Sequence, residues 1–396
     1  MKADDEAGTE TGISTRAVHA GSPAAKAGEP VVAPIHQTST FFTDAVPDGE
    51  VKYTRYGTNP NQLALAAKLS ALEGGEHAVV LGSGNAACAL SLLACAGAGD
   101  HIVAQRELYG GTLRILRREL PRLGIETTFL PDAVGWAGAV RPNTRALLME
   151  LPVNPTLYVP DIEEAARVAR THDIPLIVDG TFATPVNFRP LEHGATLVFH
   201  SATKYLGGHS DLTAGAVIGT AAKVEDVREL LKSFGPVLDP HAVWLLERGV
   251  KTLAVRMQKH NENGMAVARW LESHPLVERV FYPGLPSHRD HERAARLMSG
   301  FGGVVAMTLR GGDDAALRVL DRLRIMCVAP SLGGVETLVS MPRFTSHAAL
   351  TREERAAAGV GDGFVRLALG IEDAPDLIRD LEQAMAPELS AAAVDA

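Results

Sequence analysis

A lysine follows two hydroxyl side chains near the middle of the chain. Lys204 comes after Ser201 and Thr203, and residues 195–199 before them form an apolar run typical of a buried strand. The lysine would then lie at the carboxyl end of a strand, where open α/β sheets bind ligands. Held there, it could act as a Schiff-base nucleophile. Taken alone, residues 200–205 fit a surface loop better, so partners elsewhere in the chain must decide.

A glycine-rich turn is the first such partner. Residues 82–85, Gly-Ser-Gly-Asn, lie between an apolar strand pattern and a helical pattern. The backbone N–H groups of such a turn, together with the helix N-terminus, form an anion site, and Ser201 and Thr203 could add hydroxyl donors. The spacing does not match the dinucleotide motif G-x-G-x-x-G, and many glycine turns only reverse the chain. The turn is therefore a candidate phosphate site that depends on the other groups.

An aspartate at a second strand end suggests what the phosphate belongs to. Asp179 ends the apolar run 174–178 and would share a sheet edge with Lys204. A carboxylate there would keep a pyridine nitrogen protonated, which makes the ring of pyridoxal phosphate an electron sink. For an isolated aspartate, metal binding or helix capping would be the more common role. Beside the lysine, the cofactor role is favoured.

Two more residues supply what such a cofactor and its substrate need. Tyr109 lies between a strand and a helix, so its ring could stack on the cofactor and its phenol could move a proton; an ordinary half-buried tyrosine is the alternative. Arg366 interrupts an apolar strand. A buried arginine needs an anion, which a substrate carboxylate can supply with bidentate geometry, although a structural salt bridge would also do so.

Composition excludes several other classes of protein. The 396 residues suit two or three domains, and a formal charge of −9 without a basic block argues against a nucleic-acid partner. Three cysteines argue for a reducing, cytoplasmic location. The N-terminus does not read as a secretory signal, and the apolar stretch 79–99 is interrupted by its glycine turn, so we expect a core element and no membrane span. No metal site is predicted.

The periodicity predicts three regions: an arm at 1–58, a cofactor-binding domain at 59–245 and a substrate-side domain at 246–396 that includes a linking helix. The second alternates strands and helices, which indicates a mostly parallel sheet covered on both faces. Its expected strands are 78–81, 101–104, 146–151, 176–179 and 196–199, with helices at 62–72, 86–95, 111–123 and 162–171. A helical pattern over 240–274, with a break near Gly264, then leads to strands at 277–281, 304–309, 325–328, 337–340 and 365–369 and helices at 314–323 and 375–385.

Five blocks of this sequence resemble the Cys/Met metabolism pyridoxal-phosphate enzymes, the family of cystathionine γ-lyase, cystathionine γ-synthase and methionine γ-lyase. The resemblance extends from about residue 14 to 385. It implies an α/β fold with a large, mostly parallel-sheet domain of the aspartate aminotransferase kind and a smaller C-terminal α+β domain. The blocks are Leu-Tyr-Gly-Gly-Thr at 108–112, Glu-Leu-Pro-Val-Asn-Pro-Thr at 150–156, Val-Asp-Gly-Thr-Phe-Ala-Thr-Pro at 178–185, the stretch 200–211 around the lysine, and Ser-Leu-Gly-Gly-Val-Glu-Thr-Leu at 331–338.

The resemblance also implies a role for each matching residue. Lys204 would carry pyridoxal 5'-phosphate as a Schiff base, Asp179 would pair with the ring nitrogen, and Tyr109 would stack on the ring. The phosphate would be held by Gly84, Asn85, Ser201 and Thr203, Asn154 would lie near the phenolic oxygen, and Ser331 and Arg366 would bind the substrate.

The segment 52–60 resembles the one from which family members reach into a neighbouring subunit. Tyr53 and Arg55 would bind the neighbour's phosphate, with Tyr53 also near the substrate, so we expect a homodimer as the active unit and a homotetramer of two dimers. This chain departs from the family in three places: an extra residue after Arg55, Asn85 where methionine is usual and Gly180 where asparagine is common. None removes a required chemical group.

The implied reaction is γ-elimination from a sulfur-containing L-amino acid such as methionine or cystathionine, which yields a 2-oxo acid, ammonia and a thiol. Methionine γ-lyases often carry a cysteine where this chain has Gly111, and cystathionine enzymes often carry a glutamate where it has Pro330. An apolar residue there would weaken selection for a distal ammonium group. The alternative is γ-replacement, of the cystathionine γ-synthase or O-acylhomoserine sulfhydrylase type. A non-catalytic protein that binds the cofactor is a remote third possibility.

Overall fold

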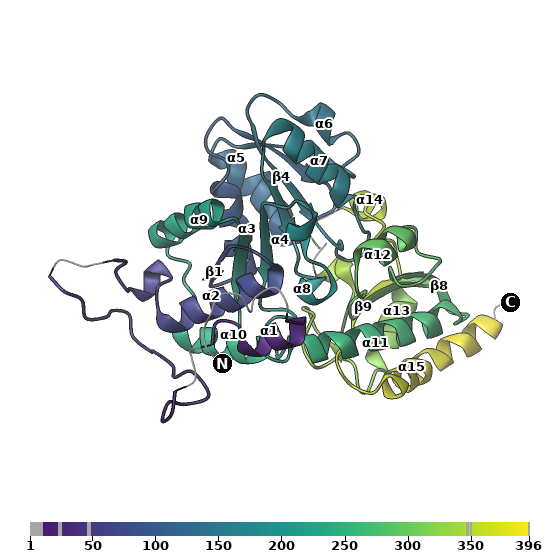
Figure 1. Ribbon diagram of the computed structural model, residues 1–396. Coiled ribbons are helices and arrows are strands. Elements are labelled where there is room, and N and C mark those ends of the chain that lie inside the picture. Colours follow the sequence, from purple (N-terminus) through teal and green to yellow (C-terminus); the bar gives the residue numbers. More distant parts are fainter. Residues whose placement is uncertain (1–10, 23–25, 46–48, 346–347, 349–350, 395–396) are drawn as a thin grey trace.

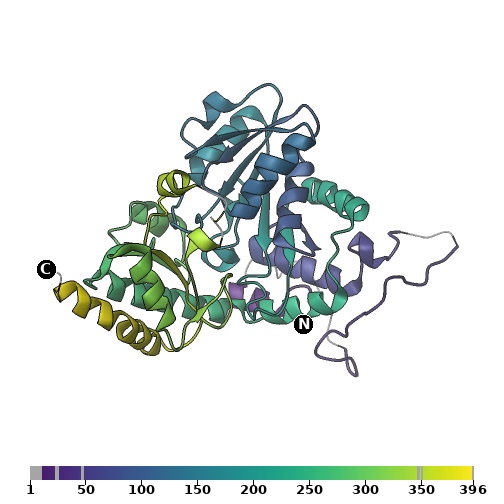
Figure 2. The same ribbon diagram turned by 180° about the vertical axis from the view of Figure 1, so that it is seen from behind.

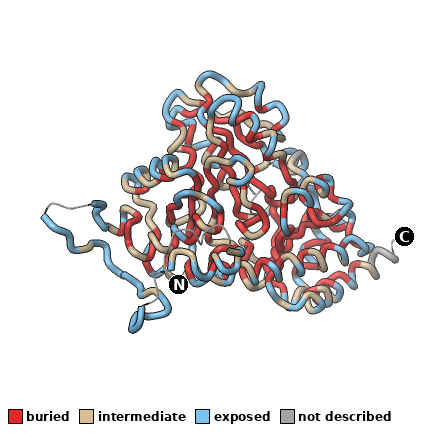
Figure 3. The backbone as a smooth tube through the Cα atoms, viewed as in Figure 1, coloured by how far each residue is buried: buried red, intermediate tan, exposed pale blue. Residues whose placement is uncertain are grey.

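The computed structural model describes residues 11–22, 26–45, 49–345, 348 and 351–394. Two sheets, each covered by helices, lie side by side (Figure 1), and the view from behind shows the same division (Figure 2). Residues 26–45 extend away from this body in both views and are largely exposed (Figure 3). The expected α/β fold with a larger and a smaller domain is therefore confirmed. The proposed boundaries at 58 and 245 stay predictions.

The larger sheet has seven strands in the order β1-β7-β6-β5-β4-β2-β3. β7 runs antiparallel to both of its neighbours, whereas the other pairs are parallel, as expected from alternating strands and helices. The strands are β1 (His77–Leu81), β2 (His101–Gln105), β3 (Glu126–Leu130), β4 (Thr144–Glu150), β5 (Leu176–Asp179), β6 (Leu197–Ser201) and β7 (Gly215–Gly219).

Helices bury both faces of this sheet. Along β1, Val79 packs with the core beneath α3 and α9, whereas Val80 packs with the core shared with α2 and α10. Two-sided burial explains the nearly continuous apolar strands of a parallel sheet. The helices are α1 (Ile13–His19), α2 (Pro60–Glu73), α3 (Gly84–Leu93), α4 (Gly110–Arg114), α5 (Leu120–Arg122), α6 (Trp136–Ala139), α7 (Ile162–His172), α8 (Thr184–Asn187), α9 (Ala221–Phe234) and α10 (Pro240–Val250). A π turn, η2 (Ile115–Glu119), lies between α4 and α5. The 3-10 turns are η1 (Thr54–Tyr56) and η3 (Pro190–His193).

The smaller sheet has five strands in the order β10-β11-β12-β9-β8, mostly antiparallel. The strands are β8 (Val277–Phe281), β9 (Val304–Leu309), β10 (Cys327–Val328), β11 (Leu338–Ser340) and β12 (Phe364–Ala368), close to the predicted ranges. The accompanying helices are α11 (Leu253–Glu272), α12 (His291–Leu297), α13 (Gly312–Asp321), η4 (Pro342–Phe344), α14 (Arg352–Ala357) and α15 (Ala374–Val394).

The expected helix break near Gly264 is wrong. The break lies instead at residues 251–252, between α10 and α11, and Gly264 is buried inside α11. A Cβ atom at Gly264 would lie 2.3 Å from the carbonyl oxygen of Gly302 and 2.6 Å from the hydroxyl of Tyr282. The glycine therefore permits close packing of the helix against the loop before β9, a role that a sequence pattern does not distinguish from a helix end.

Among the described residues, none of the helices combines the length and the apolar character that a membrane span requires.

Candidate active site

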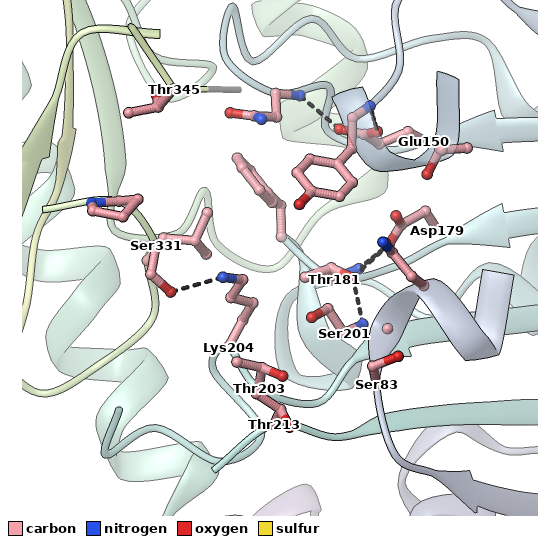
Figure 4. A pocket seen from close by; sticks show the side chains of 18 of the residues that line it. Ser83, Glu150, Asp179, Thr181, Ser201, Thr203, Lys204, Thr213, Ser331 and Thr345 are labelled. Carbon is pink, nitrogen blue, oxygen red and sulfur yellow. Dashed lines mark hydrogen bonds between the residues drawn. The ribbon is translucent and has the colours of Figure 1, made fainter. Parts of the chain in front are cut away.

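A cavity of about 720 Å³ opens at the carboxyl edge of the larger sheet, where loops of the smaller domain close its other side. The lining includes most of the predicted site residues, and Figure 4 shows Asp179, Ser201, Thr203, Lys204 and Ser331 around it. The full set of predicted residues in the lining is Gly84, Asn85, Tyr109, Asn154, Asp179, Ser201, Thr203, Lys204, Ser331 and Arg366. Distant parts of the sequence thus meet in one place.

Lys204 follows β6 in a loop that returns to β7. Its Nζ donates a hydrogen bond of 2.7 Å to the hydroxyl of Ser331 in the smaller domain (Figure 4). Burial and, after it, the positive charge of Arg366 lower the pKa of the Lys204 amine to about 8. Near neutral pH, a larger fraction of Lys204 is therefore the neutral amine than for an exposed lysine. The neutral amine is the form that attacks carbonyl carbons.

Two carboxylates lie side by side beneath the cavity. Asp179 and Glu150 are paired in register at the ends of β5 and β4, and both are buried. An Asp179 oxygen accepts from the Thr181 N–H at 3.0 Å and from the Thr181 hydroxyl at 2.5 Å. Burial raises the pKa of Asp179, and burial together with the Asp179 charge raises the pKa of Glu150 to about 8. Such a pair calls for a cationic group in the cavity.

Tyr109 lies at the start of α4, with its side chain 43% exposed at the cavity. Its backbone N–H donates to Glu150 at 2.7 Å. A Cβ atom at Gly111 would lie 2.5 Å from the Tyr109 ring and 2.8 Å from the Asn85 amide oxygen. A cysteine at position 111 would not fit without moving the Tyr109 ring. The glycine therefore allows the ring to occupy this position.

The glycine turn opens α3 beside Ser201. The Ser83 hydroxyl caps the helix by accepting from the Ala86 N–H at 3.1 Å, and the N–H groups of the first turn have no partners within the helix. Gly84 closely approaches β6, since a Cβ atom there would lie 2.6 Å from Cβ of Ser201. The Thr203 hydroxyl is already bound to the backbone of Ala214, at 2.9 Å and 3.2 Å. The turn and Ser201 are thus better placed than Thr203 to bind an anion.

Arg366 projects from β12 and is buried at 5% exposure. Its Nη1 donates to the Asn154 amide oxygen at 2.9 Å and its Nη2 to the Ser331 carbonyl at 2.8 Å. Its Nε is buried without a hydrogen-bond partner, and no carboxylate pairs with Arg366 in the described part of the chain. Burial lowers the pKa of Arg366 to about 10. The competing structural salt bridge is therefore not seen, and an anion could bind here.

Tyr53 and Arg55 do not reach this cavity. Both lie near the start of α2, where the Arg55 guanidinium stacks 5.3 Å from the Tyr53 ring centroid and donates to the Lys232 carbonyl. The cross-subunit role, which requires a second copy of the chain, stays a prediction.

Glu150 and Thr181 were not predicted as site residues from the sequence, although both line the cavity. Glu150 carries the same signal as Asp179, a carboxylate at the end of an apolar strand. The sequence does not show that β4 and β5 are neighbouring strands and that Glu150 lies opposite Asp179.

The residues of the cavity fit pyridoxal phosphate. An amine is offered by Lys204, a capped helix N-terminus by Ser83 and Gly84, and an aromatic face by Tyr109. The buried carboxylate of Asp179, whose pKa is raised by burial, would be relieved by a protonated ring nitrogen.

The chain is similar to proteins of known activity over nearly its whole length. It is 41% identical over 390 residues to the L-methionine gamma-lyase of Fusobacterium nucleatum subsp. polymorphum, covering 94% of this chain and 98% of the relative. It is 42% identical over 382 residues to the cystathionine gamma-synthase of Mycobacterium tuberculosis (strain CDC 1551 / Oshkosh), covering 95% and 97%. The structure of cystathionine gamma-lyase from Lactobacillus plantarum complexed with L-serine aligns with a TM-score of 0.90 at 35% identity, covering 95% and 99%.

The model of one family, described as Cys/Met metabolism PLP-dependent enzyme, matches residues 14–386. This range contains both sheets and every residue of the cavity. The chain therefore belongs to the pyridoxal-phosphate-dependent enzymes of Cys/Met metabolism.

Proposed function

We propose that the protein catalyses γ-elimination from a sulfur-containing L-amino acid, with methionine preferred, to give a 2-oxo acid, ammonia and a thiol. One observation supports the preference most. The carboxylates among the described lining residues are Glu150 and Asp179, and both lie at the sheet edge and accept internal hydrogen bonds. The outer wall offers Pro330 and Phe344. A methylthio group suits this wall, whereas the distal ammonium of cystathionine finds no carboxylate there.

The cofactor, when bound, withdraws electrons from the substrate α-carbon and so makes its proton acidic. Lys204 is placed to hold the cofactor and, once released, to remove that proton, because burial keeps its pKa near 8. Asp179 would pair with the ring nitrogen, Tyr109 would cover the ring face, and Asn154 would face the phenolic oxygen. Gly84, Asn85, Ser201 and Thr203 would surround the phosphate, with Thr203 acting mainly through the shape of its loop.

Tyr109 is the best candidate for protonating the departing sulfur. Its side chain lines the cavity and is half exposed, so its hydroxyl can lie near the γ-position of a substrate held by the smaller domain. Thiols leave more readily when a proton is delivered during bond cleavage. The phenol would regain its proton from water or from the Lys204 ammonium, which carries the proton taken from the α-carbon.

Arg366 would bind the substrate carboxylate. Its guanidinium is oriented by Asn154 and by the Ser331 carbonyl, and each Nη keeps a second N–H that could donate to the carboxylate. The Ser331 hydroxyl, which accepts from Lys204, would lie close to the substrate amine. Together these groups hold the α-carbon beside the lysine.

We also propose a homodimer as the active unit, in which Tyr53 and Arg55 of one copy complete the site of the other, and a homotetramer of two dimers. Both residues lie outside the cavity of their own chain, which supports this arrangement. Cys88, Cys95 and Cys327 are free thiols, which supports a cytoplasmic location.

The alternative reaction is γ-replacement on an O-acylhomoserine. The similarity to a cystathionine gamma-synthase favours it, and the same proton transfers by Lys204 would serve both reactions.

A substrate panel separates the two reactions. Purified holoenzyme is given methionine, cystathionine, homocysteine, cysteine or O-acylhomoserines, with and without a thiol, and 2-oxo acid and thioether are quantified. We expect 2-oxo acid from methionine without a thiol. Thioether formation from O-acylhomoserine, without 2-oxo acid from any sulfur amino acid, would support replacement instead. A yellow protein inert to the whole panel would support a binding protein.

A further inference from the structure

Glu150 forms hydrogen bonds to two backbone segments that line the cavity. One of its carboxylate oxygens accepts from the Tyr109 N–H and the other from the Asn154 N–H, each at 2.7 Å. Dashed lines mark both bonds at Glu150 in Figure 4. The side chain is 4% exposed at the end of β4, and its own N–H donates to the Gln105 side chain at 3.2 Å. The two N–H bonds favour the ionised form of Glu150 and so oppose the burial that raises its pKa. With one short bond to each oxygen, the side chain has one preferred position.

The two backbone groups that Glu150 binds belong to segments with different tasks. Tyr109 precedes α4 and has no side-chain cap of its own, so the Glu150 contact fixes its backbone. Asn154 orients Arg366, and Arg366 binds the Ser331 carbonyl. A continuous set of bonds therefore runs from the aromatic side of the cavity, through Glu150, to the arginine of the smaller domain.

We propose that Glu150 is a positioning residue that fixes the Tyr109 ring and the Asn154–Arg366 pair relative to each other. It does not face the reacting atoms in this role. It acts through backbone N–H groups, so the distance between the proton donor at the sulfur and the anchor at the substrate carboxylate depends on it. Misplacement of such groups by a fraction of an ångström lowers turnover.

The Glu150→Gln substitution tests this directly. Glutamine keeps the shape but has one acceptor oxygen and one NH₂ group, so one of the two N–H groups faces another donor. We expect the amides of Tyr109 and Asn154 to exchange hydrogen about tenfold faster or more. We also expect kcat/KM for methionine to fall by about 10- to 100-fold, mainly through kcat, and the circular dichroism of the visible cofactor band to change.

Asp380→Asn is the matched control. Asp380 is also a buried carboxylate that accepts backbone N–H bonds, from Arg324, Ile325 and Met326, but it lies in the smaller domain away from the cavity. Its loss should lower thermal stability while leaving amide exchange at Tyr109 and Asn154, kcat and the dichroism unchanged. An equal loss of kcat in both variants would show that Glu150 contributes only general stability and would overturn the proposal.

A second measurement asks whether Glu150 acts through Tyr109. In a Tyr109→Phe background, Glu150→Gln should lower kcat by a smaller factor than in the wild type, because the proton donor that it positions is already absent. If Glu150→Gln is not recovered folded, Glu150→Asp takes its place, since its oxygens recede by one methylene and the same amides should exchange faster.

The kinetic part rests on the proposed function, whereas amide exchange does not. A wild-type enzyme that is inactive on the whole panel would refute the proposed function. The positioning role of Glu150 would then be decided by amide exchange at Tyr109 and Asn154 alone. Unchanged exchange at both amides in the folded variants would refute the positioning role whatever the substrate.

Discussion

The floor of the cavity and its outer wall differ in how their groups are held. On the floor, Glu150, Asp179 and Thr181 are buried. Glu150 accepts from the backbone of Tyr109, and Asp179 accepts from the backbone and the hydroxyl of Thr181. On the wall, Phe344 is 56% exposed and Pro330 has no N–H to donate. The floor therefore specifies chemistry that a whole family can share, while the wall can change without disturbing it. Substitutions in the two regions should differ in the same way.

The largest effect is expected at the lysine. Lys204→Ala removes the amine that we propose holds the cofactor, so the visible absorption band of the lysine-bound cofactor should vanish and activity should fall by about 10⁴-fold or more. Absorption spectra after dialysis and single-turnover assays measure both. Lys223→Ala, at a half-buried lysine paired with Asp226 outside the cavity, is the control and should keep both. A Lys204→Ala enzyme that keeps the band would refute the assignment.

The next largest effect is expected at the arginine. Arg366→Ala removes the proposed anchor of the substrate carboxylate and two hydrogen bonds. We therefore expect kcat/KM to fall about 100-fold, equivalent to about 3 kcal/mol, mainly through a higher KM. Arg366→Lys keeps a charge but loses the fork, and should restore only a part. Steady-state kinetics with methionine measure this, and an unchanged KM in Arg366→Ala would contradict carboxylate binding.

A smaller effect is expected at the tyrosine. Tyr109→Phe keeps the aromatic face and removes the phenol, so kcat should fall about 10- to 100-fold while the visible band stays in place. A substrate with a better leaving group than methylthiol should lose less, because it needs less protonation. Equal losses for good and poor leaving groups would show that another group protonates the sulfur.

The smallest effect is expected on the wall. Pro330→Glu places a carboxylate near the distal end of the substrate, so kcat/KM for cystathionine relative to methionine should rise about fivefold, as expected for a partly exposed ion pair of about 1 kcal/mol. Pro330→Gln is the neutral control and should leave the ratio near the wild-type value. The same rise in both variants would assign the change to shape and not to charge.

The sequence was sufficient for groups that follow strands, because a strand end is a local feature. Lys204 and Asp179 were found this way, and the cavity contains both. Glu150 carries the same local signal, but its importance comes from the neighbouring register of β4 and β5, which is not local. The break placed at Gly264 failed for a related reason, since the partner of that glycine is Gly302 on a distant loop.

Strands β3 and β7 were also absent from the expected set. β3 is only half buried and begins Glu-Thr-Thr, so its apolar alternation is weak, while β7 has glycine at both ends and only three apolar residues between them. Both are stabilised by neighbours that the sequence does not identify.

The antiparallel strand β7 limits how far the length of the loop that carries Lys204 can vary. Because β7 returns directly from β6, the lysine loop is anchored at both ends, with Ser201 opposite Gly215 and Thr203 bonded to Ala214. The crossovers elsewhere in the sheet can accept insertions on the surface, whereas an insertion in this loop would move Lys204 away from Ser201 and the glycine turn. We therefore expect relatives of different length to differ at the crossovers, while the number of residues between Ser201 and Gly215 stays the same.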